Sequence, residues 1–233
     1  MSKVFCVSPA YNEEKTVAKV VEGALKNTDG IIVVDDGSID NTYKEANKAG
    51  ATVVQHNKNM GKGIALKTGF KKALEMDADI IVVLDADGQH NPEEIPKLLK
   101  TMNRENSDVV VGSRFLGNIE GMPRIRILSN TLTTSILRLY FGLPLTDSQS
   151  GYRAYKRRLL ENVEFSATRF SAETEILVDA QRKGFKISEA KIQTIYGEEK
   201  SKMRVFGDTI RWLWDVDKQL LKSLRYKLSH KNK

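Results

Sequence analysis

The sequence predicts an α/β fold in which helices cover both faces of a mostly parallel sheet. Short apolar runs such as residues 80–84 alternate with longer segments of helical pattern through the first half of the chain. Strands buried on both faces have this composition, and parallel strands need a crossover helix between them. A chain of 233 residues is long enough to form such a sheet and both helical layers in one large domain.

Five strands are predicted in the first half, and a helix follows each of the first four. The strands cover residues 3–8, 30–34, 52–55, 80–84 and 108–112. The helices cover about 13–26, 41–49 and 63–76, and a fourth begins at Pro92, a residue that suits the first turn of a helix. Polar clusters follow the first, second, fourth and fifth strands. Ligands of such sheets bind at the carboxyl ends of the strands, so we expect the functional site at this edge.

The second half of the chain is less regular. We expect a loop over 115–124, a helix over 127–141, and a polar loop over 146–153 before a short strand. A helix over 172–183 and a strand over 186–192 follow, then a basic loop over 196–205 and a long amphipathic helix over 206–228. The predicted organisation is one main domain of residues 1–205, followed by a C-terminal helix and tail of residues 206–233.

The charge distribution argues against a nucleic-acid-binding protein. The formal net charge is +7, but six Lys or Arg and no acidic residue lie between residue 218 and the end, which leaves about +1 for the rest. No apolar run reaches the ~20 residues that span a bilayer, and we expect no signal peptide and a cytoplasmic protein. The single Cys6 is predicted to be a buried thiol.

Two carboxylates follow the fourth strand directly. Asp85 and Asp87 are two residues apart, which at extended spacing places both on one side, and Gly88 allows a sharp turn after them. Paired hard oxygen donors suit Mg²⁺ or Mn²⁺, which keep open positions for phosphate oxygens. The alternative is an ordinary strand-ending turn, in which Asp and Gly are also common.

Several segments together resemble glycosyltransferase family 2, and within it the dolichyl- and polyprenyl-phosphate sugar synthases. The segments are residues 9–13 (PAYNE), 35–42 (DDGSIDNT), 59–63 (NMGKG), 85–90 (DADGQH) and 112–114 (GSR). The resemblance covers about residues 3–202 and implies a GT-A fold. It also implies metal-dependent transfer of a sugar from a nucleotide-diphosphate donor with inversion at the anomeric carbon.

The resemblance assigns the donor side of the site. It implies that Asp85, Asp87 and Gln89 hold the metal and phosphates, with Asp87 in a catalytic role. His90 matches by position, and a ligand and a structural role both stay open for it. The residues implied to bind the donor nucleotide are Pro9, Tyr11, Glu13, Asp36, Lys62 and Asp85. For Asp36 the alternative is a helix cap, and for Lys62 it is a solvated residue at a helix start.

The resemblance also implies a phosphate and acceptor side. Arg is suited to phosphate because its guanidinium donates hydrogen bonds in pairs. The residues implied to bind phosphate or acceptor are Arg114, Arg126, Ser129, Arg153 and Lys202, and Arg114 and Asp147 are implied to be catalytic. Arg124 is an alternative to Arg126, and a structural salt bridge is the alternative for Arg153. The spacing of Arg126 and Ser129 departs slightly from that of some mannose synthases, which puts mannose in doubt.

No catalytic base stands out in the sequence. A phosphate monoester has a second pKa near ~6 and is already largely ionised at neutral pH, so a lipid phosphate acceptor needs no base. The partners that the resemblance implies are a nucleotide-diphosphate sugar and a dolichyl or polyprenyl phosphate. The alternative is transfer to a hydroxyl of a saccharide or glycoprotein, which needs a base such as Asp147, Glu173 or Glu175.

Two segments suggest peripheral contact with a membrane. Residues 127–141 are rich in large apolar side chains, and the final stretch is basic with Trp212 and Trp214 upstream of it. The alternative is that the first segment packs on the core and the tail is solvated.

Overall fold

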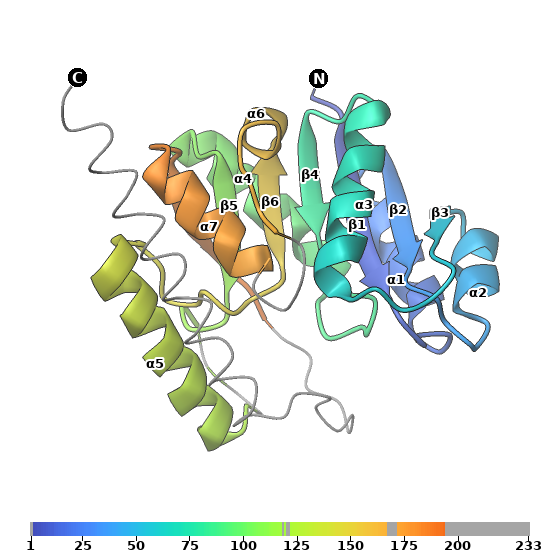
Figure 1. Ribbon diagram of the computed structural model, residues 1–233, viewed down its shortest axis with the longest axis horizontal. Helices are drawn as coiled ribbons and strands as arrows, with labels where there is room; N and C mark the ends of the chain where they lie inside the picture. The colour runs from blue at the N-terminus through green and yellow to red at the C-terminus, as the bar shows by residue number, and fades with distance from the viewer. Residues whose placement is uncertain (1, 118, 120–121, 167–171, 194–233) are drawn as a thin grey trace.

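The computed structural model describes residues 2–117, 119, 122–166 and 172–193, which form a seven-stranded sheet with helices on both faces (Figure 1). The strand order is β3-β2-β1-β4-β6-β5-β7. The strands are β1 (Val4–Ala10), β2 (Gly30–Asp35), β3 (Thr52–Gln55), β4 (Ile80–Val83), β5 (Val109–Ser113), β6 (Arg153–Lys156) and β7 (Ile187–Lys191). The predicted α/β class is confirmed, and each predicted strand is present within two residues of its expected bounds.

One strand runs against the others. β6 lies between β4 and β5 and is antiparallel to both, whereas the other pairs are parallel. The chain leaves β5 at the carboxyl edge and returns to the sheet from that same edge, so β6 has to run the opposite way. Residues 146–153 are therefore delivered to the edge at which β1, β2 and β4 end.

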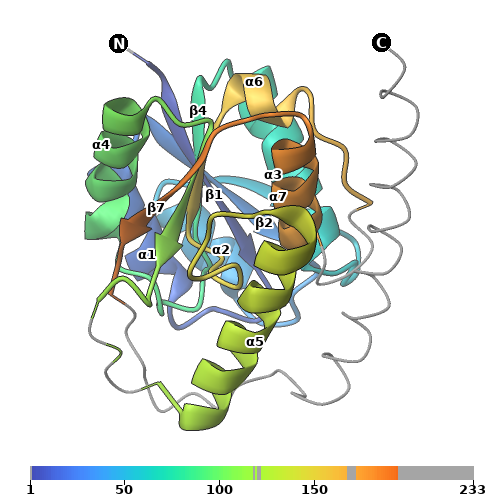
Figure 2. The same cartoon turned by 90° about the vertical axis from the view of Figure 1, so that its left-hand side faces the viewer.

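The helices form two layers. On one face lie α1 (Val17–Leu25), α2 (Thr42–Lys48) and α4 (Ile95–Glu105), which follows the short helix η1 (Pro92–Glu94). On the other lie α3 (Lys62–Glu75), α5 (Arg124–Phe141), α6 (Arg157–Leu160) and α7 (Ala172–Arg182). Figure 2 shows the sheet between α4 and α1 on one side and α3 and α7 on the other. Each layer buries its own apolar cluster, as a parallel sheet requires.

Several element bounds differ from the prediction. The first helix starts at Val17 rather than Glu13, and the N–H groups of residues 12–14 donate to the side chains of Ser38, Thr42 and Asp40 in the segment after β2. α5 begins at Arg124, three residues early, with Pro123 directly before it. The four-residue α6 was not predicted. The predicted helix over 206–228 lies outside the described residues.

Candidate active site

The loops after β1 and β2 interlock at the carboxyl edge. The N–H of Asn12 donates to Ser38 Oγ (2.9 Å), and the N–H of Glu13 donates to Thr42 Oγ1 (2.8 Å). Tyr11, in the loop after β1, is 39% exposed and so accessible to a ligand. Pro9, Tyr11 and Glu13, the predicted nucleoside-binding residues, therefore lie beside the acidic segment after β2.

Asp36 in this acidic segment is buried and fastens the next loop. Its Oδ1 accepts from the N–H of Met60 (3.0 Å) and lies 2.7 Å from His56 Nδ1, and its Oδ2 accepts from the N–H of Gly61 (2.7 Å). Gly37 beside it has φ +75°, and a Cβ there would lie 2.4 Å from the carbonyl carbon of Lys58. The predicted contact of Asp36 with the nucleoside stays a prediction, and the described contacts give this carboxylate a loop-holding role.

Asp36→Asn is expected to loosen the loop of residues 59–61 and to weaken nucleotide-sugar binding. The amide offers one acceptor atom where the carboxylate has two, so one of the N–H groups of Met60 and Gly61 is left unpaired. An unsatisfied donor of this kind costs about 1–3 kcal/mol of stability. Thermal unfolding and calorimetric titration with nucleotide sugars measure both effects. Unchanged values in both would contradict the loop-holding role.

Lys62, at the start of α3, bridges two carboxylates. Its Nζ lies 2.7 Å from Asp85 Oδ1, 3.0 Å from Asp85 Oδ2 and 3.3 Å from Glu173 Oε1. Burial alone would lower the pKa of Lys62, but the charges of Asp85 and Glu173 outweigh burial and raise it. A Cβ on Gly151 would come within 3.2 Å of all three side chains, so the backbone of the loop before β6 closes over this cluster.

Asp87 stands next to this cluster with its carboxylate in an unfavourable environment. Burial and the negative charge of Asp85 raise the pKa of Asp87 to about 6. Its Oδ1 accepts from the N–H of Gln89 (2.9 Å), while Asp85 Oδ1 is buried and accepts no well-aligned hydrogen bond within the described part of the chain. A carboxylate whose ionisation is disfavoured by the charge of a neighbouring carboxylate fits a divalent cation between the two. Among the described residues, no group of three or more His, Cys, Asp or Glu could hold a metal ion, so Gln89, phosphate or water would supply the other positions.

His90 packs as a neutral ring under the site. Its side chain is buried, and its ring centroid lies 5.1 Å from that of Tyr152, whose hydroxyl donates to the carbonyl of Asn91 (3.1 Å). Burial lowers the pKa of His90 to about 4, so the imidazole is uncharged at neutral pH. Its Nδ1 has no hydrogen-bond partner among the described residues. The ring packing fits a structural role and the unpartnered Nδ1 fits a ligand role, so both roles stay open for His90.

Arg114 and Asp147 form a buried, two-pronged ion pair. Arg114 Nε lies 2.6 Å from Asp147 Oδ2, its Nη2 lies 2.8 Å from Oδ1, and its backbone N–H also donates to Oδ2 (3.2 Å). Asp147 is 0% exposed. The carboxylate is thus engaged in orienting Arg114, and the geometry does not favour Asp147 as a base. Glu175 is similarly engaged, because it accepts from the N–H and hydroxyl of Ser166.

The remaining predicted phosphate-binding residues lie in different surroundings. Arg153 is 1% exposed, and its guanidinium donates to the carbonyls of Ser148, Ser150 and Glu173, so it holds the 148–153 loop instead of facing a ligand. Arg126 and Ser129 are half-buried in the first turns of α5, which reaches past the carboxyl edge of the sheet in Figure 1. Lys202 lies outside the described residues.

The sequence did not single out His56 or Glu189, which hold loops of the site. His56 follows β3 and contacts Asp36 and, through Nε2, Thr68 Oγ1 (3.0 Å). Glu189 lies inside β7 and accepts from the backbone of residues 146 and 147. The position of His56 after a strand at the predicted edge is a usable signal, whereas nothing local marks Glu189.

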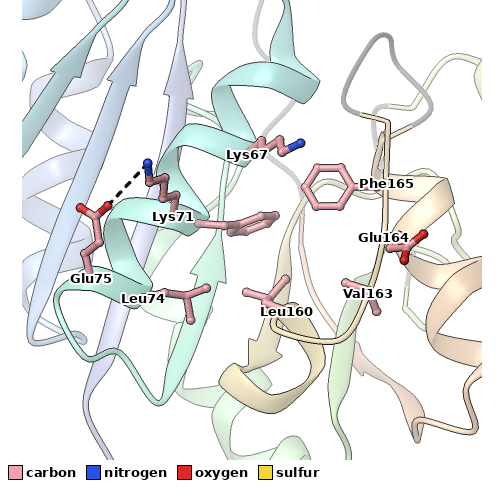
Figure 3. A pocket seen from close by; sticks show the side chains of 9 residues that line it. Lys67, Lys71, Leu74, Glu75, Leu160, Val163, Glu164 and Phe165 are labelled. Atoms are coloured by element: carbon pink, nitrogen blue, oxygen red, sulfur yellow. Dashed lines mark ion pairs between the residues drawn. The ribbon is translucent and has the colours of Figure 1, made fainter.

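A hollow of about 750 Å³ lies away from the carboxyl edge, between α3 and the segment 160–165 (Figure 3). It is lined by Lys67, Phe70, Lys71, Leu74, Glu75, Leu160, Val163, Glu164 and Phe165. None of the predicted site residues is among them, so this hollow is separate from the candidate active site.

Comparisons with known proteins agree with this arrangement. A sequence profile described as glycosyl transferase family 2 matches residues 5–164. A UDP-N-acetylglucosamine–dolichyl-phosphate N-acetylglucosaminyltransferase of Methanococcus voltae is 37% identical over 217 residues, covering 84% of this chain and 86% of the relative. An undecaprenyl-phosphate mannosyltransferase of Micrococcus luteus is 30% identical over 230 residues, covering 90% and 93%.

A solved structure confirms the fold. Glucosyl-3-phosphoglycerate synthase of Mycobacterium tuberculosis, in complex with Mn²⁺ and uridine-diphosphate-glucose, matches with a TM-score of 0.72 and 24% identity, covering 95% of this chain and 79% of that one. The predicted GT-A fold is thereby confirmed. From the profile match and the sequence relatives, this chain belongs to glycosyl transferase family 2 and is a glycosyltransferase.

Proposed function

We propose that this protein transfers a sugar, with inversion, from a nucleotide-diphosphate sugar to a dolichyl or polyprenyl phosphate. The observation that carries the proposal is the cluster at the carboxyl edge, where Asp85 and Asp87 lie beside Lys62 and the loops after β1 and β2. The relatives named for dolichyl- and undecaprenyl-phosphate acceptors support the acceptor class.

The residues of this chain divide the work as follows. Asp85 and Asp87 would hold Mg²⁺ or Mn²⁺, which when bound neutralises the diphosphate leaving group. Lys62 adds positive charge beside the same phosphates, at the N-terminus of α3, where anions are favoured. Arg114, which follows β5 and is oriented by Asp147, would donate to a phosphate. Asp85 and Asp87 fit a divalent ion because a cation between them would offset the charge of Asp85, which disfavours ionisation of Asp87.

A phosphate acceptor fits this site better than a hydroxyl acceptor. An ionised phosphate attacks without giving a proton to the protein. A hydroxyl acceptor needs a general base within hydrogen-bond reach. Of the three predicted bases, Asp147 is held by Arg114, Glu175 is held by Ser166, and Glu173 pairs with Lys62. Transfer to a saccharide or glycoprotein hydroxyl would therefore rest on Glu173 alone.

The test begins with a donor screen by calorimetry, in which GDP and UDP sugars are titrated with Mn²⁺. The donor that binds is then offered with polyprenyl phosphate, with the matching polyprenol or with a saccharide, and products are resolved by mass spectrometry. We expect metal-dependent binding of one donor and transfer only to the phosphate. Transfer to the polyprenol or to a saccharide, abolished by Glu173→Gln, would establish the hydroxyl alternative instead.

We also propose that α5 lies against the membrane that carries the acceptor. Its outer side exposes large apolar residues, with Leu128 67% and Leu139 80% exposed, and Arg124, Arg126 and Arg138 lie on the same helix. Apolar side chains flanked by arginines are typical of helices that lie in a membrane interface. Within the described ranges, no helix has the length and hydropathy needed to cross a bilayer.

The double variant Leu128→Glu/Leu132→Glu is expected to lose most of its association with vesicles. Two carboxylates on the exposed side of α5 cannot enter the apolar interface and are repelled by anionic lipid. Flotation with vesicles of anionic and zwitterionic phospholipid measures the bound fraction. Leu25→Glu at the end of α1, where the leucine is 38% exposed, serves as the matched control and should bind as the wild type does. Equal binding of all three proteins would contradict this role of α5.

A further inference from the structure

Glu189 makes an unusual set of contacts for a residue inside a strand. It lies on β7 opposite Val111 of β5, and its carboxylate reaches the turn that precedes Asp147. The N–H of Thr146 lies 2.8 Å from each of its oxygens, and the N–H of Asp147 donates to Oε1 (3.0 Å). The hydroxyl of Thr146 also donates to it, at 2.9 and 3.0 Å. A side chain of the edge strand β7 thereby holds the turn through hydrogen bonds from the backbone of the turn.

The hydroxyl groups near Glu189 can be arranged so that each donates to the next and the last donates to Glu189. The N–H of Phe115 donates to Ser113 Oγ (3.2 Å), and the Ser113 hydroxyl lies 2.7 Å from Thr146 Oγ1. If the Ser113 hydroxyl donates to Thr146, the Thr146 hydroxyl is left to donate to Glu189. Three groups then donate to Glu189, and an ionised carboxylate, which only accepts, can satisfy all three. Serine and threonine hydroxyls thus couple the end of β5 to the same turn.

This network is connected to Arg114 in two ways, through the backbone of Ser113 and through the side chain of Asp147. Ser113 directly precedes Arg114 in the chain, and Asp147, whose N–H is held by Glu189, holds the Arg114 guanidinium at 2.6 and 2.8 Å. A displacement of the turn carries the Asp147 carboxylate with it and changes the direction in which Arg114 points. In a transfer reaction, misplacement of a phosphate-binding group by about 1 Å can cost about 100-fold in rate.

We propose that Glu189 is a positioning residue for sugar transfer, which fixes the turn of residues 146–147 so that Asp147 presents Arg114 to a phosphate of the substrates. This inference rests on the proposed function, in which Arg114 binds phosphate. Glu189 itself acts through the turn and does not touch substrate. The competing explanation is that Glu189 only ties β7 to the rest of the fold.

The experiment compares Glu189→Gln with a matched control. Glutamine has the same shape, but its NH₂ group faces N–H donors and cannot accept from them. We expect kcat/KM for polyprenyl phosphate to fall about 10- to 100-fold, with a smaller effect on the melting temperature than the control has. The control is Asp108→Asn at the opposite end of the same strands, where a buried carboxylate accepts from the N–H of Lys186 (3.0 Å) and from Arg158. It should lower the melting temperature and leave kcat/KM unchanged.

A double variant separates positioning from fold support. If Glu189 acts through Arg114, Glu189→Gln should cost much less in an Arg114→Lys background than in the wild type. Equal losses in both backgrounds, or a loss matched by Asp108→Asn, would overturn the inference. Failure of the proposed function looks different, because the wild type itself would then transfer no sugar to polyprenyl phosphate.

Discussion

Asp87→Asn is expected to lower kcat/KM by a factor of about 100 or more and to abolish metal-dependent binding of the donor. A metal that neutralises a leaving diphosphate contributes several kcal/mol, and each ~1.4 kcal/mol is a factor of ten in rate. The amide keeps one oxygen but removes the charge that attracts the cation. Calorimetric titration of the donor with and without Mn²⁺, together with steady-state kinetics, measures the loss.

The same substitution is expected to stabilise the fold at neutral pH. The pKa of Asp87 is raised from 3.8 to about 6 by burial and by Asp85, so the folded protein holds this proton more tightly than the unfolded chain does. As pH rises from about 4 to 6, the unfolded state ionises first and stability falls; above 6 the full penalty remains. Removing the group should recover on the order of 1–3 kcal/mol at pH 7 and nothing below pH ~4.

These opposite effects distinguish a metal site from damage to the fold. A misfolded variant would lose both activity and stability, whereas Asp87→Asn should lose only activity. Asp77→Asn is the matched control, because the side chain of Asp77 is 86% exposed. It lies beyond the end of α3, with its carboxylate 3.7 Å from the guanidinium of Arg157. It should change neither quantity. Wild-type donor affinity in Asp87→Asn, with Mn²⁺ present, would contradict the metal-binding role.

The parts of the fold that could be predicted are those with a local signal. The apolar runs that form β1, β2, β4 and β5 are buried on both faces. A strand buried on both faces needs apolar residues at consecutive positions, and such a run is visible in the sequence. The direction of β6 has no such signal, because it is set by the path that the chain takes through α5 between β5 and β6. The carboxyl-edge location of the site followed from the order of strands and polar loops.

The roles of individual arginines depend on tertiary contacts that the sequence does not contain. Arginine is rarely buried, so its presence in a polar loop favours a ligand-binding interpretation. Arg153 instead donates to three carbonyls in the interior, a role set by the return of the chain into β6. Arg114 and Asp147 are separated by 33 residues, and their pairing appears only when β5 and the 146–147 turn meet at one edge. The sequence therefore shows which residue types lie in these loops, but it does not show which side chains bond to one another.

Asp147→Ala is expected to destabilise the protein by about 3–5 kcal/mol and to abolish most transfer activity. The substitution leaves the Arg114 guanidinium, with a side chain only 14% exposed, without the carboxylate that it meets at 2.6 Å. Breaking a buried ion pair by removing one partner costs this much because a charge stays buried without compensation. Urea unfolding measures the stability, and kcat/KM for polyprenyl phosphate measures the activity.

The double variant Asp147→Leu/Arg114→Met tests whether the ion pair serves sugar transfer or only the stability of the fold. Replacing both charges by apolar side chains of similar volume is often neutral for stability or better, since the desolvation cost of the charges disappears with them. If the pair exists to present Arg114 to a phosphate, the double variant should regain the stability that Asp147→Ala loses and still transfer no sugar. Activity restored together with stability would mean that the pair serves the fold alone, and Arg114 would lose its place in the site.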